Sequence, residues 1–158
     1  MNVLLLGDIF GRPGRRIVAE LLPELKEKYQ SGLIVANGEN AAGGFGLTKK
    51  VAEQLFSLGI QVLTSGNHIW DQKEMLSYIS QEPRILRPAN YPPDVPGSSV
   101  YIHKGDQAVI AVANLIGRVF MQDFDCPFRK ADQILAELPD SVTHVIVDFH
   151  GEATPEKI

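Results

Sequence analysis

Residues 3–8 read Val3-Leu4-Leu5-Leu6-Gly7-Asp8, an apolar run that ends in a glycine and a carboxylate. Three later apolar runs also end in polar residues, at Glu39 with Asn40, at Asn67 and at His150. Apolar runs that alternate with segments of helical periodicity indicate a βαβ protein with parallel strands. Because ligands bind beyond the carboxyl ends of such strands, we expect these polar side chains to meet there.

The pattern along the chain predicts strands near residues 2–7, 33–37, 60–65, 99–103, 108–113 and 143–149, and helices near 13–28, 48–58, 72–80 and 128–138. We expect the first strand to be buried on both faces. Pro23 lies inside the first helical pattern, which predicts a kink or a helix in two pieces.

Local signals mark several boundaries. Thr48 is the expected N-cap and Gly59 the expected stop of the helix near 48–58. Asp71 and Glu74 form a variant of the capping box for the next helix. Residues 81–97 contain five prolines and predict a structured loop. The hairpin that follows is a β insertion in an α/β pattern, which favours a mixed sheet or two stacked sheets.

Size and composition exclude several classes of protein. The length of 158 residues predicts one domain, residues 1–158, with a hydrophobic core. No apolar run approaches the roughly 20 residues of a membrane span. The start lacks the features of a signal peptide and Cys126 is the only cysteine, so we expect a cytoplasmic protein. A net charge of -4 argues against non-specific binding to nucleic acid.

A local basic cluster of Arg12, Arg15 and Arg16 follows the first strand. It suits a nucleotide-sized ligand, and a solvated basic helix start is the equal alternative. Gly43, Gly44 and Gly46 let the backbone approach a ligand closely, but their spacing does not form a phosphate-binding loop or a dinucleotide fingerprint.

The polar strand ends suit a divalent metal ion. Glu39 has two carboxylate oxygens that can bridge two cations, and Asn40 adds an amide oxygen. Oxygen and imidazole ligands without thiolate suit Mn, Fe or Zn. Two such ions about 3.5–4 Å apart would clamp a phosphoryl group and generate hydroxide at neutral pH. The imidazole of His68, beside Asn67, is suited to proton transfer.

Each of these residues also has a structural interpretation. Asp8 would be a turn or N-cap residue, Asn67 and His68 a turn asparagine beside a core histidine, and His150 a capped structural residue. A purely structural explanation requires all of these interpretations to hold at once, on four separate strands. Together the residues therefore favour a ligand site. His103 and His144 are interpreted as ordinary residues, and Trp70 as packing beneath its loop.

Four blocks of sequence resemble the YmdB-type branch of the calcineurin-like metallophosphoesterases: GDIFGRPGR (7–15), NGENAAGG (37–44), TSGNHIWD (64–71) and VDFHGEAT (147–154). The resemblance implies an α/β fold of two stacked sheets flanked by helices, in four layers α/β/β/α. It also implies a di-metal phosphodiesterase acting on 2',3'-cyclic nucleotides. In the family pattern Asp8, Glu39 and Asn40 hold one metal, and Glu39, Asn67 and His150 hold the other. His68 is then the proton donor to the leaving oxygen.

The sequence departs from the wider superfamily at Phe10, where a histidine is usual, and at Glu39, where aspartate is usual. Both departures belong to the YmdB-type branch. The family also has a Gly-x-His-x-His segment after the His150 block, and residues 1–158 do not contain it. The resemblance therefore implies that these residues supply one imidazole too few to each metal. A naturally short protein, a fragment, or completion by a second chain would explain this.

The leading hypothesis from the sequence is a metal-dependent phosphodiester hydrolase whose substrate is a small phosphodiester or cyclic nucleotide. The alternative is a regulatory protein that binds a metal or nucleotide without turnover. A third hypothesis, a flavodoxin- or Rossmann-like nucleotide binder, leaves Asn67, His68 and His150 unexplained. Missing strands would leave an open sheet edge, so a homo-oligomer is a further expectation.

Overall fold

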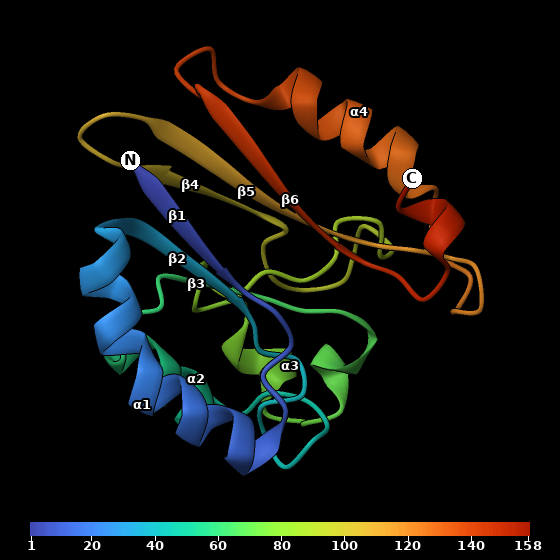
Figure 1. Ribbon diagram of the computed structural model, residues 1–158. Helices are drawn as coiled ribbons and strands as arrows, with labels where there is room; N and C mark the ends of the chain where they lie inside the picture. Colours follow the sequence, from blue (N-terminus) through green and yellow to red (C-terminus); the bar gives the residue numbers. More distant parts are fainter.

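Two three-stranded sheets form the centre of the protein in the computed structural model, which describes residues 1–158 (Figure 1). The first sheet is parallel, in the order β1 (Asn2–Leu6), β2 (Ser31–Asn37) and β3 (Val62–Thr64). The second sheet contains β4 (Val100–Lys104), β5 (Val109–Ile116) and β6 (His144–His150). Strand β4 is antiparallel to β5 and β6 is parallel to it, so the predicted hairpin is confirmed and the second sheet is mixed.

Helices cover the outer faces of both sheets, which gives the layers α/β/β/α (Figure 1). Helices α1 (Gly11–Tyr29) and α2 (Lys49–Ser57) pack on the first sheet through Leu22 and Leu55. Helix α4 (Pro127–Glu137) packs on the second sheet through Ile134. A separate apolar cluster lies between the sheets and joins Val35 of β2 to Val112 of β5. The predicted two-sheet sandwich flanked by helices is thus confirmed.

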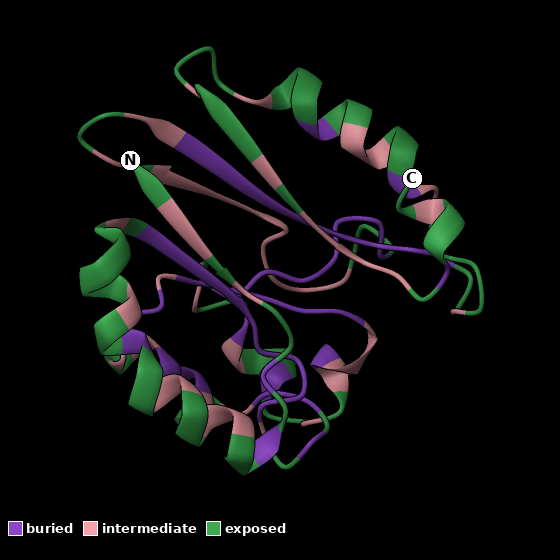
Figure 2. Cartoon of the chain, viewed as in Figure 1, coloured by how far each residue is buried: buried purple, intermediate pink, exposed green.

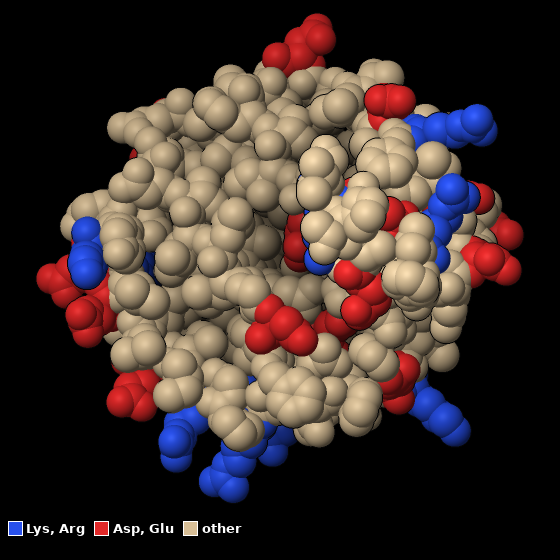
Figure 3. Space-filling view, turned by 45° about the vertical axis from the view of Figure 1, so that its right-hand side comes forward, with Lys and Arg blue, Asp and Glu red and all other residues tan.

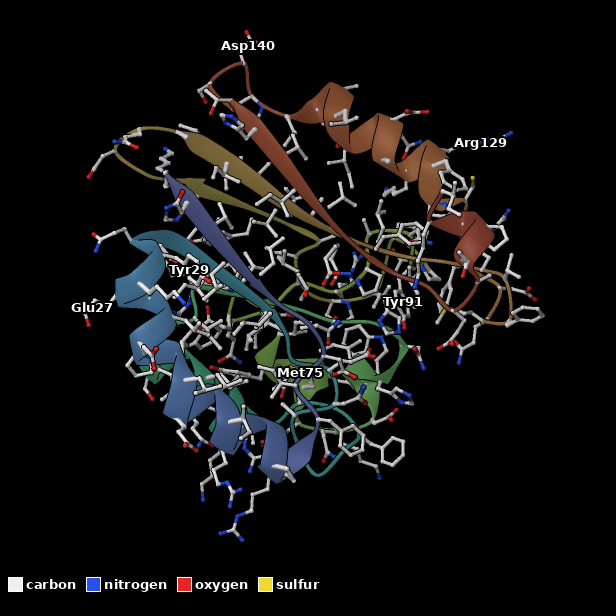
Figure 4. All side chains as sticks on the ribbon, in the orientation of Figure 1. Glu27, Tyr29, Met75, Tyr91, Arg129 and Asp140 are labelled. Carbon is white, nitrogen blue, oxygen red and sulfur yellow. The ribbon has the colours of Figure 1, made fainter.

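Burial follows these layers. Strands β2 and β5, which are central in their sheets, are buried along most of their length, and the short β3 is buried throughout (Figure 2). Met75 and Tyr91 lie in the interior, whereas Glu27, Arg129 and Asp140 point away from it (Figure 4). No helical segment combines the length and the apolar composition that a membrane span requires.

Strand β1 corrects one expectation, because it is an edge strand and is not buried on both faces. It pairs only with β2, and its other edge is open. Leu5 is consequently 58% exposed, and Asp8 just beyond the strand is also exposed. The apolar run Val3–Leu6 indicates a strand that packs against a core. It does not indicate whether one or two strands pair with it, so the edge position could not be predicted.

The structure also corrects two helix predictions. Of the two outcomes predicted at Pro23, a helix in two pieces is wrong, because α1 runs as one helix through this residue. Proline has no backbone N–H, so the helix loses one hydrogen bond there. Packing of the buried Leu22 against the sheet offsets this loss. The Thr48 cap, in contrast, is confirmed, because its Oγ1 accepts from the Val51 N–H at 3.2 Å.

No capping box forms at Asp71 and Glu74. The helix predicted near 72–80 is reduced to α3 (Met75–Tyr78), which follows the 3-10 helix η1 (Asn67–Trp70); a second, η2 (Thr154–Glu156), lies near the end of the chain. Asp71 is hydrogen-bonded to His68, and Glu74 accepts from the Lys49 N–H at 3.1 Å. Because both carboxylates have partners elsewhere, neither caps the helix.

Residues 81–97 form the predicted loop, which contains no helix or strand. Near its start, Arg84 Nη2 lies 2.6 Å from Glu82 Oε2, and the guanidinium lies 3.9 Å from the centre of the Phe56 ring. The hydrogen bond from Arg84 lowers the pKa of Glu82 below its usual 4.5.

We expect this ion pair to make stability depend on pH. The unfolded state binds more protons than the native state in the acidic range, so the contribution of the pair is present above pH 4.5 and is lost as pH falls through the lowered pKa. Because Arg84 is partly exposed, the contribution is about 1 kcal/mol. Urea unfolding at several pH values should show a flatter acidic profile for Glu82→Gln than for the exposed control Glu53→Gln. Equal profiles would contradict this.

Asn114 joins the two sheets. It lies on β5, is fully buried, and accepts from the Ser65 N–H at 2.6 Å while it donates to the Ser65 carbonyl at 2.9 Å. Ser65 directly follows β3 of the first sheet. A second hydrogen bond links the sheets, because Thr64 Oγ1 of β3 donates to the Asp148 carboxylate of β6. These bonds align the carboxyl ends of β3, β5 and β6 at one edge of the sandwich.

Replacing Asn114 by leucine, which has nearly the same shape, is expected to destabilise the protein by about 2–5 kcal/mol, because both backbone groups of Ser65 lose their partner in a buried place. Denaturant unfolding measures this loss. Gln54→Leu, at an exposed position on α2, serves as the control and should change stability by less than about 0.5 kcal/mol. A similarly small effect at Asn114 would show that the sheets do not depend on this connection.

Candidate metal centre

The polar strand ends meet at the carboxyl edge of the sandwich. Asn40 Nδ2 donates to Asp8 Oδ2 at 2.8 Å and to Glu39 Oε1 at 3.3 Å. His150 Nε2 lies 3.3 Å from the same Glu39 oxygen, Oε1, and 3.0 Å from Asn67 Oδ1. The five residues that the sequence singled out as metal ligands therefore form one connected cluster with Glu39 at its centre.

Glu39 is nearly inaccessible to solvent, at 1% exposed. Burial raises the pKa of its carboxyl group above the usual 4.5, although nearby His150 and the hydrogen bond from the His68 N–H act in the opposite direction. That N–H donates to Glu39 Oε2 at 3.2 Å. A buried carboxylate is costly unless positive charge lies beside it. The position of Glu39 is one where a bound cation would stabilise the charged form.

Gly66 provides the space for this cluster. A Cβ atom at position 66 would overlap both the Glu39 carboxylate and the His150 ring. Glu39 lies just after β2 and His150 ends β6 of the other sheet, so this close approach depends on the absence of a side chain between them.

His68 lies at the border of the cluster and is half-buried. Its Nδ1 is 2.7 Å from Asp71 Oδ2. A carboxylate that accepts from Nδ1–H fixes the orientation of the ring and leaves Nε2 for another partner. Sequence reasoning had assigned Asp71 to a helix cap and missed this contact. The spacing of three residues within a single turn was the available signal.

A cavity of about 490 Å³ adjoins the cluster between β1 and β6. Asp8 and His150 both line it, together with Asn37, Thr64 and Asp148, so residues 142 positions apart in the chain face one space. The charged Asp148 interrupts the apolar run 145–149, a signal that sequence reasoning did not use. In Figure 3, some acidic side chains lie beside a central hollow, whereas others stand at the rim together with most of the basic ones. Acidic groups beside the hollow favour cations there.

The donor set fits a hard or borderline divalent ion only if the asparagines take part. The structure contains no group of three or more His, Cys, Asp and Glu side chains arranged to hold a metal ion. A metal site here must therefore use the amide oxygens of Asn40 and Asn67. With them the cluster offers carboxylate, amide and imidazole donors, which suit Mn, Fe or Zn.

The other histidines lie away from the cluster. His144 begins β6, at the opposite end of the strand from His150, and His103 lies on β4 opposite Ile110, whose other neighbour is His144. Trp70 packs against core residues and against the Tyr91 ring, with 6.2 Å between ring centres. Burial raises the pKa of Tyr91 to about 12. Of the three arginines after β1, Arg12 and Arg16 are exposed, and Arg15 donates to the Ala41 carbonyl.

An α/β/β/α sandwich with these connections is the metallophosphoesterase fold, and solved structures agree closely with it. A protein from Thermus thermophilus superposes with a TM-score of 0.92 at 38% identity, over 99% of this chain and 60% of its own. A phosphatase from Mycoplasma pneumoniae superposes with a TM-score of 0.90 at 32% identity, over 98% and 57%.

The chain belongs to the YmdB-like protein family, whose sequence profile matches residues 4–158. It is 44% identical to the 2',3'-cyclic-nucleotide 2'-phosphodiesterase of Bacillus subtilis (strain 168), over 100% of this chain and 60% of that protein. The chain thus spans about three fifths of the length of its relatives.

Proposed function

We propose that this chain carries the metal-binding face of a metal-dependent phosphodiesterase that cleaves small phosphodiesters, with 2',3'-cyclic nucleotides as the substrate class. The observation that carries the proposal is the buried Glu39 carboxylate, which links Asp8 through Asn40 and contacts His150, itself hydrogen-bonded to Asn67. The Bacillus subtilis relative is named a 2',3'-cyclic-nucleotide 2'-phosphodiesterase, which supports the choice of substrate.

In this proposal two divalent ions, Mn, Fe or Zn, would share Glu39. Asp8, Glu39 and Asn40 would hold one ion, and Glu39, Asn67 and His150 would hold the other. Bound ions of this kind would supply positive charge to the phosphoryl oxygens and activate water as a nucleophile. The asparagines would bind through their amide oxygens, so Asn40 would turn and release the hydrogen bond that its Nδ2 donates to Asp8.

His68 acts as the general acid. The water loses one proton to solvent as its oxygen bonds to phosphorus, the bond from phosphorus to the ribose oxygen breaks, and the imidazolium of His68 gives a proton to that departing oxygen. His68 then regains its proton from solvent. Asp71 is the positioning residue, because its carboxylate holds Nδ1–H and leaves Nε2 for the substrate.

The test is elemental analysis combined with a phosphodiesterase assay on the protein as expressed from its own coding region. We expect bound Mn, Fe or Zn, and hydrolysis of 2',3'-cyclic AMP that a chelator abolishes and added metal restores. Bound metal without hydrolysis of any phosphodiester would favour the regulatory alternative. A protein that binds none of these metals would contradict the proposed function.

A further inference from the structure

Two large aromatic side chains stand in solvent beside the proposed metal cluster. Phe10 and Phe45 are each 59% exposed, although both belong to short loops at the carboxyl edge of the first sheet. Phe10 follows Asp8 by two residues, and Phe45 lies five residues after Asn40. Exposing an apolar ring to water is unfavourable, so two such rings near a ligand site suggest a ligand with an apolar face.

The loop that carries Phe45 is held in place. The Phe45 carbonyl accepts from Gln72 Nε2 at 2.8 Å, and the Gly44 N–H donates to the Asn40 carbonyl at 3.2 Å. The Phe10 ring lies directly over Gly44, where a Cβ would come within 2.9 Å of Phe10 Cζ. Gly44 has a φ of 100°, a conformation that favours glycine. Phe45 is therefore presented on a fixed loop tied to a proposed metal ligand.

Phe45 also contacts the proposed general acid. Its ring centre is 5.4 Å from that of His68, and the rings meet edge to face at 70°. Because His68 protonates the departing ribose oxygen, the ribose must lie on the His68 side of the cluster. The ring that borders His68 is that of Phe45, so a base attached to this ribose can reach it.

From this geometry we propose that Phe45 is a specificity-determining residue whose exposed ring stacks on the nucleobase of the substrate, while Phe10 positions its loop. The inference rests on the proposed function and adds that the site selects nucleotides over phosphodiesters without a base. Stacking on an aromatic ring accepts every base, so we expect little discrimination among the four bases.

The test compares Phe45→Leu with wild type on two substrates, adenosine 2',3'-cyclic monophosphate and 1-O-methylribose 2',3'-cyclic phosphate, which lacks the base. We expect KM to rise about tenfold for the nucleotide and to stay within about twofold for the base-free compound. Tyr29→Leu is the matched control, an exposed aromatic residue at the last position of α1. Calorimetry should show a similar weakening for adenosine 3'-monophosphate and none for 1-O-methylribose 3'-monophosphate.

Equal effects of Phe45→Leu on both substrates, or no effect on either, would overturn the role of Phe45 while leaving the proposed function intact. If wild type cleaves neither substrate, the proposed function fails. Calorimetry still decides the inference in that case, because equal binding of adenosine 3'-monophosphate by wild type and Phe45→Leu would overturn it.

Discussion

Glu39→Gln is expected to weaken the binding of both metal ions by more than about 100-fold, because altering a group that merely supports a metal ligand already costs about 10–100-fold. Glu39 lies at the centre of the cluster, 3.3 Å from Asn40 Nδ2 and 3.3 Å from His150 Nε2. The loss of its charge therefore affects both halves of the site. Hydrolysis should fall with metal content, as measured by elemental analysis and manganese titration calorimetry.

The same substitution should not unfold the protein. Glutamine has nearly the shape of glutamate and avoids a buried charge, so the midpoint of thermal unfolding without metal should not decrease. Added manganese should raise this midpoint in wild type but not in Glu39→Gln. Glu53→Gln, an exposed carboxylate on α2, should behave as wild type. Full metal binding by Glu39→Gln would remove the basis of the proposed function.

His68→Ala is expected to lower kcat by about 100- to 10,000-fold with much less change in KM, because proton donation to the leaving oxygen acts in the transition state. Metal content should be retained, since the hydrogen bond from His68 to Glu39 comes from the backbone N–H, which alanine keeps. Steady-state kinetics with 2',3'-cyclic AMP, together with elemental analysis, measures both quantities.

A substrate with a better leaving group separates this role from a structural one. With a p-nitrophenyl phosphodiester, whose leaving oxygen needs little protonation, the loss of kcat in His68→Ala should shrink markedly. His103→Ala, on β4 at the far end of the second sheet, is the control and should retain wild-type kinetics. An equal loss of kcat on both substrates, or the same loss in His103→Ala, would contradict the assignment.

Much of the site could be predicted because the direction of a parallel strand is visible in the sequence. An apolar run followed by a polar residue marks the carboxyl end of a strand, and these ends share one edge. Asp8, Glu39, Asn40, Asn67 and His150 were selected in this way, and the structure brings them together. Their role as metal ligands stays a prediction.

Contacts made by side chains in loops were harder to predict. Asp71 and Glu74 had the spacing of a capping box, but His68 and the Lys49 N–H are their partners in the folded chain. Phe45 attracted no attention, because a single phenylalanine among glycines has no periodicity that marks it as exposed. The role proposed for Phe45 depends on its contact with the ring of His68, which lies 23 residues further along the chain.

The sequence by itself determined the alternation of strands and helices and the polar residues at strand ends, and it predicted that these residues share a ligand site. These features can be predicted from local periodicity and short motifs, because each feature depends on residues that are close together in the sequence. Only the tertiary structure decided that β1 is an edge strand, that Asn114 joins the sheets, and that Gly66 makes room for Glu39 beside His150. These features depend on distant partners and on the space between two packed sheets, which no stretch of sequence records alone.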